Sequence, residues 1–306
     1  MNARMDETIA SVRRTVRSFG VAAAVLAAVG LSVGPRSALA KNPQSPATRV
    51  SASRTADPTE ARADVSSTFE INPRVDFRFY SWKEFDANNV EHLSEDGLLF
   101  AIGVDPRVAF GPSKRFFVES PTRLYFGKVG YDGYVGAAPY KSKTGYFGFE
   151  LLPSAGYVLS LGRRFQLSPT VGIGFEHWNR DLDDGGQLGY DEKYTVYLVH
   201  AGLRGTYLLN RDIAFHSKLG LKVPVSISES VGLGMRGRGQ PVNVSLSPGI
   251  SPAILVEGGT TIHGFDVSLY YEGWTLAKSA LDRGYLQPES TRKIFGIRLG
   301  HAFSFN

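Results

Sequence analysis

The sequence predicts an all-β fold, namely a single antiparallel transmembrane β-barrel of about ten strands, with short periplasmic turns and long outer loops. Three observations lead to this prediction. Long segments alternate apolar with polar residues, short and long connections follow each other along the chain, and the chain opens on an export segment. Each is taken in order below.

The first forty residues have the pattern of a secretory signal peptide. A basic stretch, residues 13–17, precedes an apolar run from Phe19 to Leu31, and the segment ends in small residues at Ala38 and Ala40. The alternative is an uncleaved anchor, but the run is shorter than the ~20 apolar residues that a spanning helix needs. We therefore predict cleavage between Ala40 and Lys41, after which the chain reaches the cell envelope.

Composition excludes several classes of protein. The chain has no cysteine, so neither a disulfide framework nor a thiolate metal site is possible. The formal net charge is +5, but five arginines and two acids in the first forty residues supply +3 of it. The near-neutral remainder gives no support for nucleic-acid binding. Residues 41–65 are rich in Ser, Thr, Ala and Pro, which predicts a disordered periplasmic tether, and residues 66–306 are assigned to the barrel.

From Phe69 onward the hydrophobic pattern has period two, as in a strand with one apolar face. In the first segment Val75, Phe77 and Phe79 alternate with charged residues. Many of these segments exceed the five or six residues typical of soluble strands, and they suit tilted strands that cross a bilayer. The predicted strands are 69–82, 97–109, 121–131, 145–159, 165–181, 193–207, 212–226, 242–257, 262–276 and 291–305.

The connections alternate in length, which favours short turns at one end of a barrel and long loops at the other. Tight turns are predicted at 160–164, 208–211 and 258–261, and long polar loops at 83–96, 132–144, 182–192, 227–241 and 277–290. The segment 110–120 is too long for a tight turn. Pro169, Pro248 and Pro252 fall in the lipid-facing register and predict bulges or bends, because proline cannot donate to a strand ladder.

The last segment, KIFGIRLGHAFSF, carries its apolar residues on one face and ends with Phe303 and Phe305. It resembles the aromatic-ended strand by which outer-membrane barrels are recognised for assembly, although the final residue is Asn306 rather than Phe. Together with the other two observations, the chain resembles the bacterial outer-membrane β-barrel or porin-like superfamily. The resemblance implies the outer membrane of a diderm bacterium. It also implies three partners: outer-membrane lipid, lipopolysaccharide, and the barrel-assembly machinery through the C-terminal strand.

Charges of both signs fall on the face that would line the lumen. A ten-stranded barrel is little wider than the eight-stranded kind, which side chains nearly fill. Isolated charges would be costly there, whereas neutralising networks are tolerated, so we predict a salt-bridged plug. The residues assigned to the lumen are Arg74, Asp76, Arg78, Asp105, Arg107, Arg123, Glu150, Glu176, Arg204, His216, Lys218, Glu257, Asp266, Glu272 and Arg298.

The three tryptophans lie near the outer ends of strands but on the inward parity. Together with nearby tyrosine, carboxylate and arginine side chains they could form a shallow ligand pocket at the outer mouth. The alternative is an aromatic girdle, because a slip of one residue in register reverses both faces. The candidate binding residues are Trp82, Glu176, Trp178, Arg180, Tyr270, Glu272 and Trp274.

The predicted function is non-enzymatic: a plugged outer-membrane barrel with a structural or surface-interaction role. A narrow porin for small solutes is the alternative, and a soluble periplasmic β-protein remains open. A rim-located enzyme, either a protease or a lipid A-modifying enzyme, is disfavoured because the adjacent Glu176 and His177 point to opposite faces of a strand. No catalytic residue, metal site or cofactor is predicted.

Overall fold

The computed structural model describes residues 68–135, 138–183, 191–235 and 238–305, and every regular element within them is a β-strand. The predicted signal peptide and tether lie outside the described residues. Among the described residues there is no helix long and apolar enough to cross a membrane.

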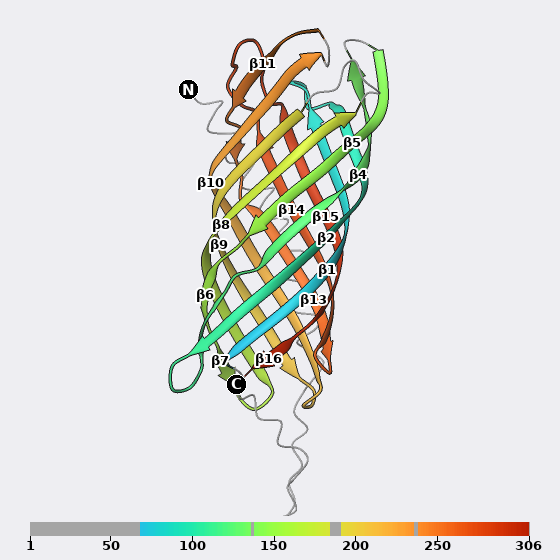
Figure 1. Cartoon of the computed structure of the whole chain (residues 1–306). Coiled ribbons are helices and arrows are strands. Elements are labelled where there is room, and N and C mark those ends of the chain that lie inside the picture. The colour runs from blue at the N-terminus through green and yellow to red at the C-terminus, as the bar shows by residue number, and fades with distance from the viewer. Residues whose placement is uncertain (1–67, 136–137, 184–190, 236–237, 306) are drawn as a thin grey trace, which may run out of the picture. The chain divides into compact units, whose positions relative to one another are not determined.

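Ten strands close into a ring in which each pairs antiparallel with both neighbours (Figure 1). The predicted fold class is thereby confirmed. In order around the ring, the strands are β1 (Phe69–Phe85), β2 (Glu91–Phe110), β4 (Thr122–Val135), β5 (Ala138–Leu151), β8 (Phe165–Asp183), β9 (Asp191–Leu208), β10 (Ile213–Met235), β13 (Ala253–Ile262), β14 (Phe265–Ala277) and β15 (Glu289–His301). β15 returns to pair with β1, with Asp76 opposite Arg298, and closes the barrel.

Six shorter strands extend the ring strands after local breaks. They are β3 (Phe116–Glu119), β6 (Ser154–Tyr157), β7 (Leu159–Leu161), β11 (Arg238–Leu246), β12 (Gly249–Ile250) and β16 (Phe303–Phe305). β3 pairs with β2 and β6, and β6 pairs with β8. These two short strands therefore continue the wall past the ends of β4 and β5, between β2 and β8. Each of the ten predicted segments therefore corresponds to one ring strand, sometimes in two or three pieces.

Prolines explain most of the breaks. The strand predicted over 145–159 is interrupted near Pro153, and the one over 242–257 near Pro248 and Pro252, where bends were predicted. Pro169 remains within β8. Opposite it, the neighbouring strand is broken into β6 and β7, and the pairing with β8 is interrupted between the pairs Gly156–Thr170 and Leu159–Leu167. The lipid-facing register predicted for Pro248 is wrong, because its side chain is buried.

We call the end of the barrel near Phe69 and Phe305 the inner end, and the opposite end the outer end. The inner-end connections are short: 111–115, 162–164, 209–212 and 263–264. The first of these resolves the long segment 110–120 into a turn followed by β3. The turn predicted at 258–261 is wrong, since these residues are strand and the chain reverses at His263 and Gly264, both with positive φ (49° and 83°). That pair of angles is typical of a two-residue hairpin turn.

At the outer end, three of the polar segments predicted as loops, 83–96, 132–144 and 227–241, are mostly strand. β1 and β2 leave 86–90 between them, and the longest described connection is 278–288. The hairpins continue beyond the apolar belt, where outward residues are mostly polar and inward positions mix glutamates with apolar residues such as Leu93 and Ile227. The alternation is weak there, which is why the sequence pattern indicated loops.

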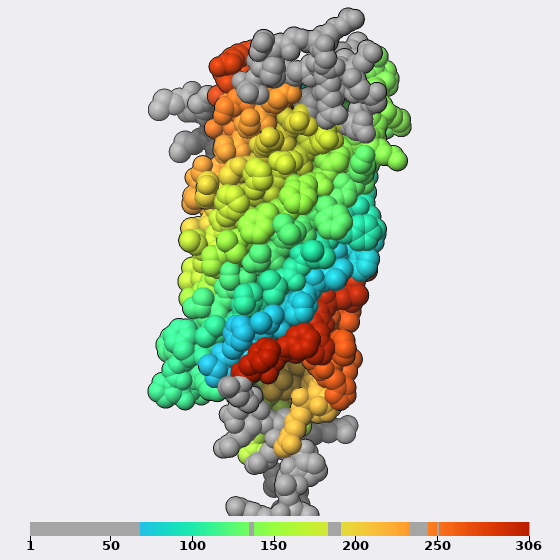
Figure 2. All heavy atoms as spheres, viewed as in Figure 1, coloured from blue at the N-terminus to red at the C-terminus, as the bar shows by residue number. Residues whose placement is uncertain are grey.

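The two faces of the wall differ as the alternating pattern predicted. Outward side chains in the middle of the barrel and toward its inner end are apolar and exposed: Ile173 is 66% exposed and Val267 52% exposed. On the same strands, the side chains that alternate with these outward residues point into the barrel and pack there. In Figure 2 the strands run as slanted bands of closely packed side chains around the wall.

Candidate functional site

The charged residues assigned to the lumen all lie inside the barrel, either buried or half-buried, so the predicted inward register is confirmed. They are joined there by tyrosine and tryptophan side chains that pack into one hydrophobic cluster with aliphatic residues. The lumen contents form three levels along the barrel, which we call the outer, middle and inner clusters.

The outer cluster consists of Glu84, Glu95, Arg180, Glu192 and Glu229. Its centre is Arg180 on β8, whose side chain has no exposed surface. The guanidinium donates to Glu95 at 3.0–3.1 Å, to Glu192 at 2.6 Å and to Glu84 at 3.0 Å. Three carboxylates thus contact one cation, and with Glu229 the cluster holds four acidic groups to one basic group.

Glu229 is the member of the outer cluster that the arginine does not pair with. Its side chain is buried, while Ser228 and Ser230 beside it are exposed, so it lies beyond the apolar belt. Burial, followed by the carboxylates of Glu192 and Glu84, raises the pKa of Glu229 to about 9. This carboxyl therefore holds its proton at neutral pH, which lowers the negative charge of the cluster.

Aromatic rings fill the remaining width beside the outer cluster. Trp178 and Tyr194 stack with ring centroids 4.7 Å apart, and Trp82 lies 5.8 Å from the same Tyr194 ring. Trp82 is on β1 and Tyr194 on β9, and these strands are opposite each other in the ring. The rings therefore span the lumen from wall to wall.

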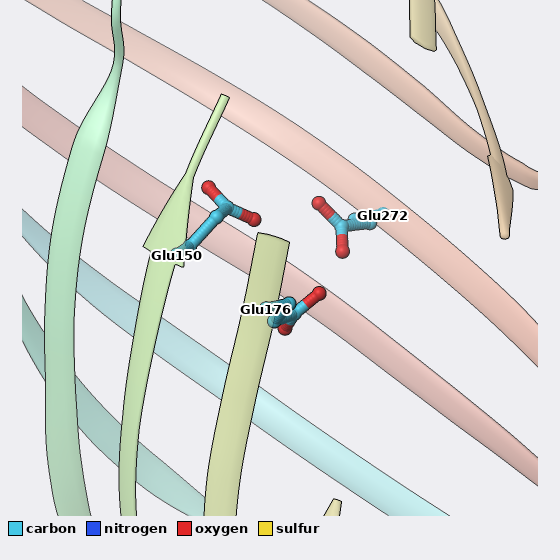
Figure 3. Close-up of side chains that lie close together, drawn as sticks. All are labelled: Glu150, Glu176 and Glu272. Atoms are coloured by element: carbon cyan, nitrogen blue, oxygen red, sulfur yellow. The ribbon is translucent and has the colours of Figure 1, made fainter. Parts of the chain in front are cut away.

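The middle cluster consists of Glu150, Glu176, Lys222, Glu272 and Arg292. The carboxylates of Glu150, Glu176 and Glu272 point toward one another from β5, β8 and β14 (Figure 3). Lys222 Nζ lies 2.7 Å from both Glu150 and Glu272. Arg292 donates to Glu176 at 2.8 Å and to Glu272 at 3.1 Å.

The three carboxylates of the middle cluster could in principle hold a metal ion, since one oxygen from each lies within 4.8 Å of the others. Their charges are, however, already compensated by Lys222 and Arg292, and also by Arg123, which donates to Glu150 at 2.6 Å. A divalent cation would have to displace the bridging ammonium group. The arrangement is that of an ion-pair network and not of a metal site.

One contact of the middle cluster joins opposite walls. Arg292 is on β15 and Glu176 on β8, five strands apart in either direction around the ring. The guanidinium lies between Trp178 and Trp274, 4.8 Å from each ring centroid. The lumen is therefore bridged at this level by one arginine held between two indole rings.

The inner cluster consists of Asp76, Glu257, Asp266, Tyr270 and Arg298. Arg298 donates to Asp76 at 2.9 and 3.1 Å and to Glu257 at 2.5 Å, and its guanidinium lies 4.5 Å from the Tyr270 ring centroid. Asp266 receives hydrogen bonds from Ser268 and Thr261, at 3.4 and 3.2 Å.

The seven residues of the predicted outer-mouth pocket all point inward, but they belong to different levels. Trp82, Trp178 and Arg180 lie in or beside the outer cluster. Glu176, Glu272 and Trp274 lie at the middle cluster, where Trp274 Nε1 donates to Glu272 at 2.6 Å. Tyr270 lies in the inner cluster and donates to Asp76. Their side chains contact other lumen residues, and ligand binding by them stays a prediction.

The histidines near the outer end do not meet carboxylates. His177 faces outward and lies 3.0 Å from the hydroxyl of Thr195, and His92 stacks on Tyr134. Among the described residues, the ion-pair contacts of histidine are at the inner end, where His216 lies 3.5 Å from Asp266 and 3.8 Å from Glu257, and His263 lies 3.5 Å from Asp212. A rim-located acid–base site of histidine and two carboxylates is not formed in the described part of the chain.

Sequence reasoning missed much of the outer and middle clusters. Glu84, Glu95, Glu192 and Glu229 lay in segments interpreted as loops, and Arg292 was left out of the lumen set although it has the parity of Arg298. The signal was present, because the inward parity of Trp82 continues to Glu84. Extending each alternating segment into the polar region beyond it would have found Glu84, Glu95 and Glu192. It would have missed Glu229, because a register shift between Pro224 and Ser226 changes the inward parity of β10.

Comparisons with known proteins support the fold. No protein-family model matches the chain, and no curated protein matches its sequence. The structure is similar to that of the outer membrane protease OmpT from Escherichia coli, with a TM-score of 0.55, 9% identity, and 77% of this chain and 96% of that chain covered.

Two further structures match with lower scores. The toluene transporter TbuX from Ralstonia pickettii has a TM-score of 0.42 and 9% identity over 78% of this chain and 90% of that chain. The outer membrane protein OprG from Pseudomonas aeruginosa has a TM-score of 0.39 and 12% identity over 78% of this chain and 98% of that chain. At these scores and identities the likeness says nothing about activity.

Proposed function

Starting from the fold of the bacterial outer-membrane β-barrel superfamily, we propose that this protein is a non-conducting outer-membrane barrel with a structural or surface-interaction role. One observation carries the proposal: Arg292 and Glu176, on opposite walls of the ring, are joined by a 2.8 Å ion pair. An arginine that reaches across the lumen and is held between two tryptophans obstructs a continuous water path.

The outer cluster supports the same conclusion at a second level. Arg180 on β8 reaches Glu84 on β1 and Glu95 on β2, and the Trp82 and Tyr194 rings meet beside it. Two obstructions in series, each made of buried side chains with several partners, leave little room for a solute. Rigid filling of this kind favours a structural or interaction role.

The outer face supports membrane insertion and lipid contact. Lys193 on β9 and Lys293 on β15 are exposed just beyond the last outward apolar residues of their strands, Tyr197 and Phe295. Cations at that height are suitably placed for the phosphates of lipopolysaccharide. Replacing both Lys193 and Lys293 with Gln should weaken lipopolysaccharide binding by the refolded protein, and unchanged affinity would remove this assignment.

Export and assembly complete the proposal. The signal peptide is cleaved between Ala40 and Lys41, and the C-terminal strand is recognised by the barrel-assembly machinery. Fractionation of expressing cells should place the mature chain in the outer membrane, resistant to carbonate, with Lys41 at its N-terminus. Release by carbonate, or an N-terminus elsewhere, would contradict these two steps.

Liposome swelling tests the proposed lack of conduction. Vesicles containing the refolded 41–306 chain should swell no faster in small sugars or amino acids than vesicles without protein. Swelling that depends on solute size would identify the alternative, a narrow porin. A general porin of known activity, refolded in the same lipids, controls for vesicle quality.

A further inference from the structure

We propose that the inner half of the lumen contains a binding site for a small dianionic oxyanion of the phosphate class. The site is a cavity of about 60 Å³ that lies beside the inner cluster, on the inner side of the middle cluster, and is lined among others by Arg107, Gly202, Arg204, Lys218 and Gly220. It is independent of the proposed surface role, because a closed barrel can bind an anion from its inner end.

Two of the lining cations lie directly side by side. Arg204 on β9 and Lys218 on β10 are cross-strand partners on the inward face. Like charges in this position are destabilising unless something compensates them. Within the described residues no carboxylate lies within 4.0 Å of Lys218, and the ion-pair contact of Arg204 is a long one, 3.9 Å to Glu257. The Nε of Arg204 is buried without a hydrogen-bond partner.

A third cation lines the same cavity from β2. Arg107 packs its guanidinium over the Phe117 ring, 3.8 Å from the centroid. Among the described residues it has no carboxylate within ion-pair distance. By contrast, the lining cations Lys222 and Arg298, which belong to the middle and inner clusters, are already neutralised, since each contacts two carboxylates. Glu70 and Glu119 also line the cavity, but they lie beyond ion-pair distance of these cations. Within the described part of the chain, Arg107, Arg204 and Lys218 are therefore the lining cations that have no carboxylate at hydrogen-bond distance.

A pair of glycines provides the space. Gly202 and Gly220 are cross-strand partners, one step outward from the Arg204–Lys218 pair. A Cβ at Gly202 would lie 2.9 Å from Thr170 Oγ1 and 3.4 Å from Lys218 Cε, so a side chain there would crowd this part of the cavity. Two inward positions without side chains, beside two adjacent cations, leave space next to Arg204 and Lys218.

The size and charge of the hollow indicate the ligand. A volume of about 60 Å³ holds a few water molecules, comparable to the four oxygens of a tetrahedral oxyanion. Arginine and lysine are the side chains that bind phosphate most often, arginine through its planar fork and lysine as a point charge. A dianion would compensate the adjacent charges of Arg204 and Lys218 together. Arg107 and Lys218 are half-buried although they face inward, so solvent reaches the cavity.

Calorimetric titration of the refolded chain in detergent micelles tests the proposal, with inorganic phosphate, glycerol phosphate and chloride as the probes. We expect one phosphate per chain and no binding of chloride. Lys218→Gln and Arg204→Gln should each weaken phosphate binding by about tenfold or more, since a hydrogen bond to a charged group is lost. The matched control is Arg211→Gln, an exposed cation in a turn at the same end, which should leave the affinity unchanged.

A second variant separates charge from shape. Gly220→Val keeps every cation but adds a side chain whose Cβ would lie 3.4 Å from Leu255 Cβ, and it should also abolish binding. Thermal unfolding of each variant confirms that it is folded. Phosphate should raise the unfolding temperature of the natural chain and of Arg211→Gln, but not that of Lys218→Gln, Arg204→Gln or Gly220→Val.

The outcomes also distinguish the source of the anion. Binding of glycerol phosphate would identify an organic phosphate, such as a lipid headgroup, as the source, and its exclusion would identify free phosphate. The proposal is overturned if the folded natural chain does not bind phosphate, if chloride competes equally, or if Lys218→Gln and Arg204→Gln bind as the natural chain does.

Discussion

Replacing Arg292 with methionine should destabilise the barrel far more than loss of any surface charge. Methionine preserves part of the packing between Trp178 and Trp274 but removes the ion pairs to Glu176 and Glu272. Glu272 retains Lys222 at 2.7 Å, whereas Glu176 retains the Tyr125 hydroxyl at 3.3 Å. Removing one partner of a buried pair costs about 3–5 kcal/mol, because the remaining charge is left uncompensated.

The double variant R292M/E176Q distinguishes an uncompensated charge from lost packing. It also removes the Glu176 carboxylate, which has lost its arginine partner in R292M. We therefore expect the double variant to recover more than half of the free energy of unfolding that R292M loses. Both are measured by urea unfolding of the refolded chain in lipid vesicles, followed by tryptophan fluorescence. The control is Lys83→Met, which breaks the half-exposed Lys83–Glu91 pair and should cost no more than about 1 kcal/mol. The reasoning is refuted if R292M costs no more than this control, or if the double variant is less stable than R292M.

Two further predictions concern the outer cluster and the packing of the middle one. Because burial raises the pKa of Glu229 to about 9, the folded state holds a proton that the unfolded state releases near its ordinary pKa, so stability from this group is complete below that pKa and lost as pH rises through 9. The free energy of unfolding should fall by on the order of 3–4 kcal/mol between pH 6 and 9, and Glu229→Gln should flatten this slope in urea titrations. An unchanged slope would contradict the assignment. Gly148→Ala places a Cβ 2.2 Å from Tyr125 Cζ and should lower the free energy of unfolding by about 1–3 kcal/mol. The control is Gly258→Ala, where no atom lies within 4 Å of the added Cβ, and it should change stability by less than about 0.5 kcal/mol. Equal effects of the two variants in thermal unfolding would show that packing at Gly148 does not stabilise the barrel.

The strand pattern could be predicted because it depends on local alternation. Any strand with one face toward lipid and the other toward a filled lumen repeats with period two, so the inward set from Arg74 to Arg298 followed directly from the sequence. The breaks near Pro153, Pro248 and Pro252 are local as well, although the sequence did not indicate the first one. Strand ends were less predictable, since beyond the apolar belt the outward face becomes polar and the inward face mixes carboxyl groups with apolar side chains, so the alternation is weak.

The pairing of charges could not be predicted because it depends on the register around the whole ring. Arg292 and Glu176 meet only because ten strands, each offset against the next, bring β15 and β8 face to face at the same height. Similarly, the predicted pocket residues Tyr270 and Trp178 share a parity but lie at different levels. Sequence alternation determines the side of the wall, and the cumulative stagger of the strands determines the height.

Single-channel recording in planar bilayers tests the closed lumen most directly, with the refolded 41–306 chain compared with a variant in which Arg292, Glu176, Glu272, Arg180 and Trp82 are all replaced by Ser. This variant removes the Arg292 bridge of the middle cluster and, at the outer cluster, the arginine and one of the rings that span the lumen. A general porin refolded in the same lipids is the positive control for insertion. We predict no steady open steps from the natural chain and measurable steps from the variant. Steady openings of the natural chain that disappear after heat unfolding would contradict the plug and identify a porin.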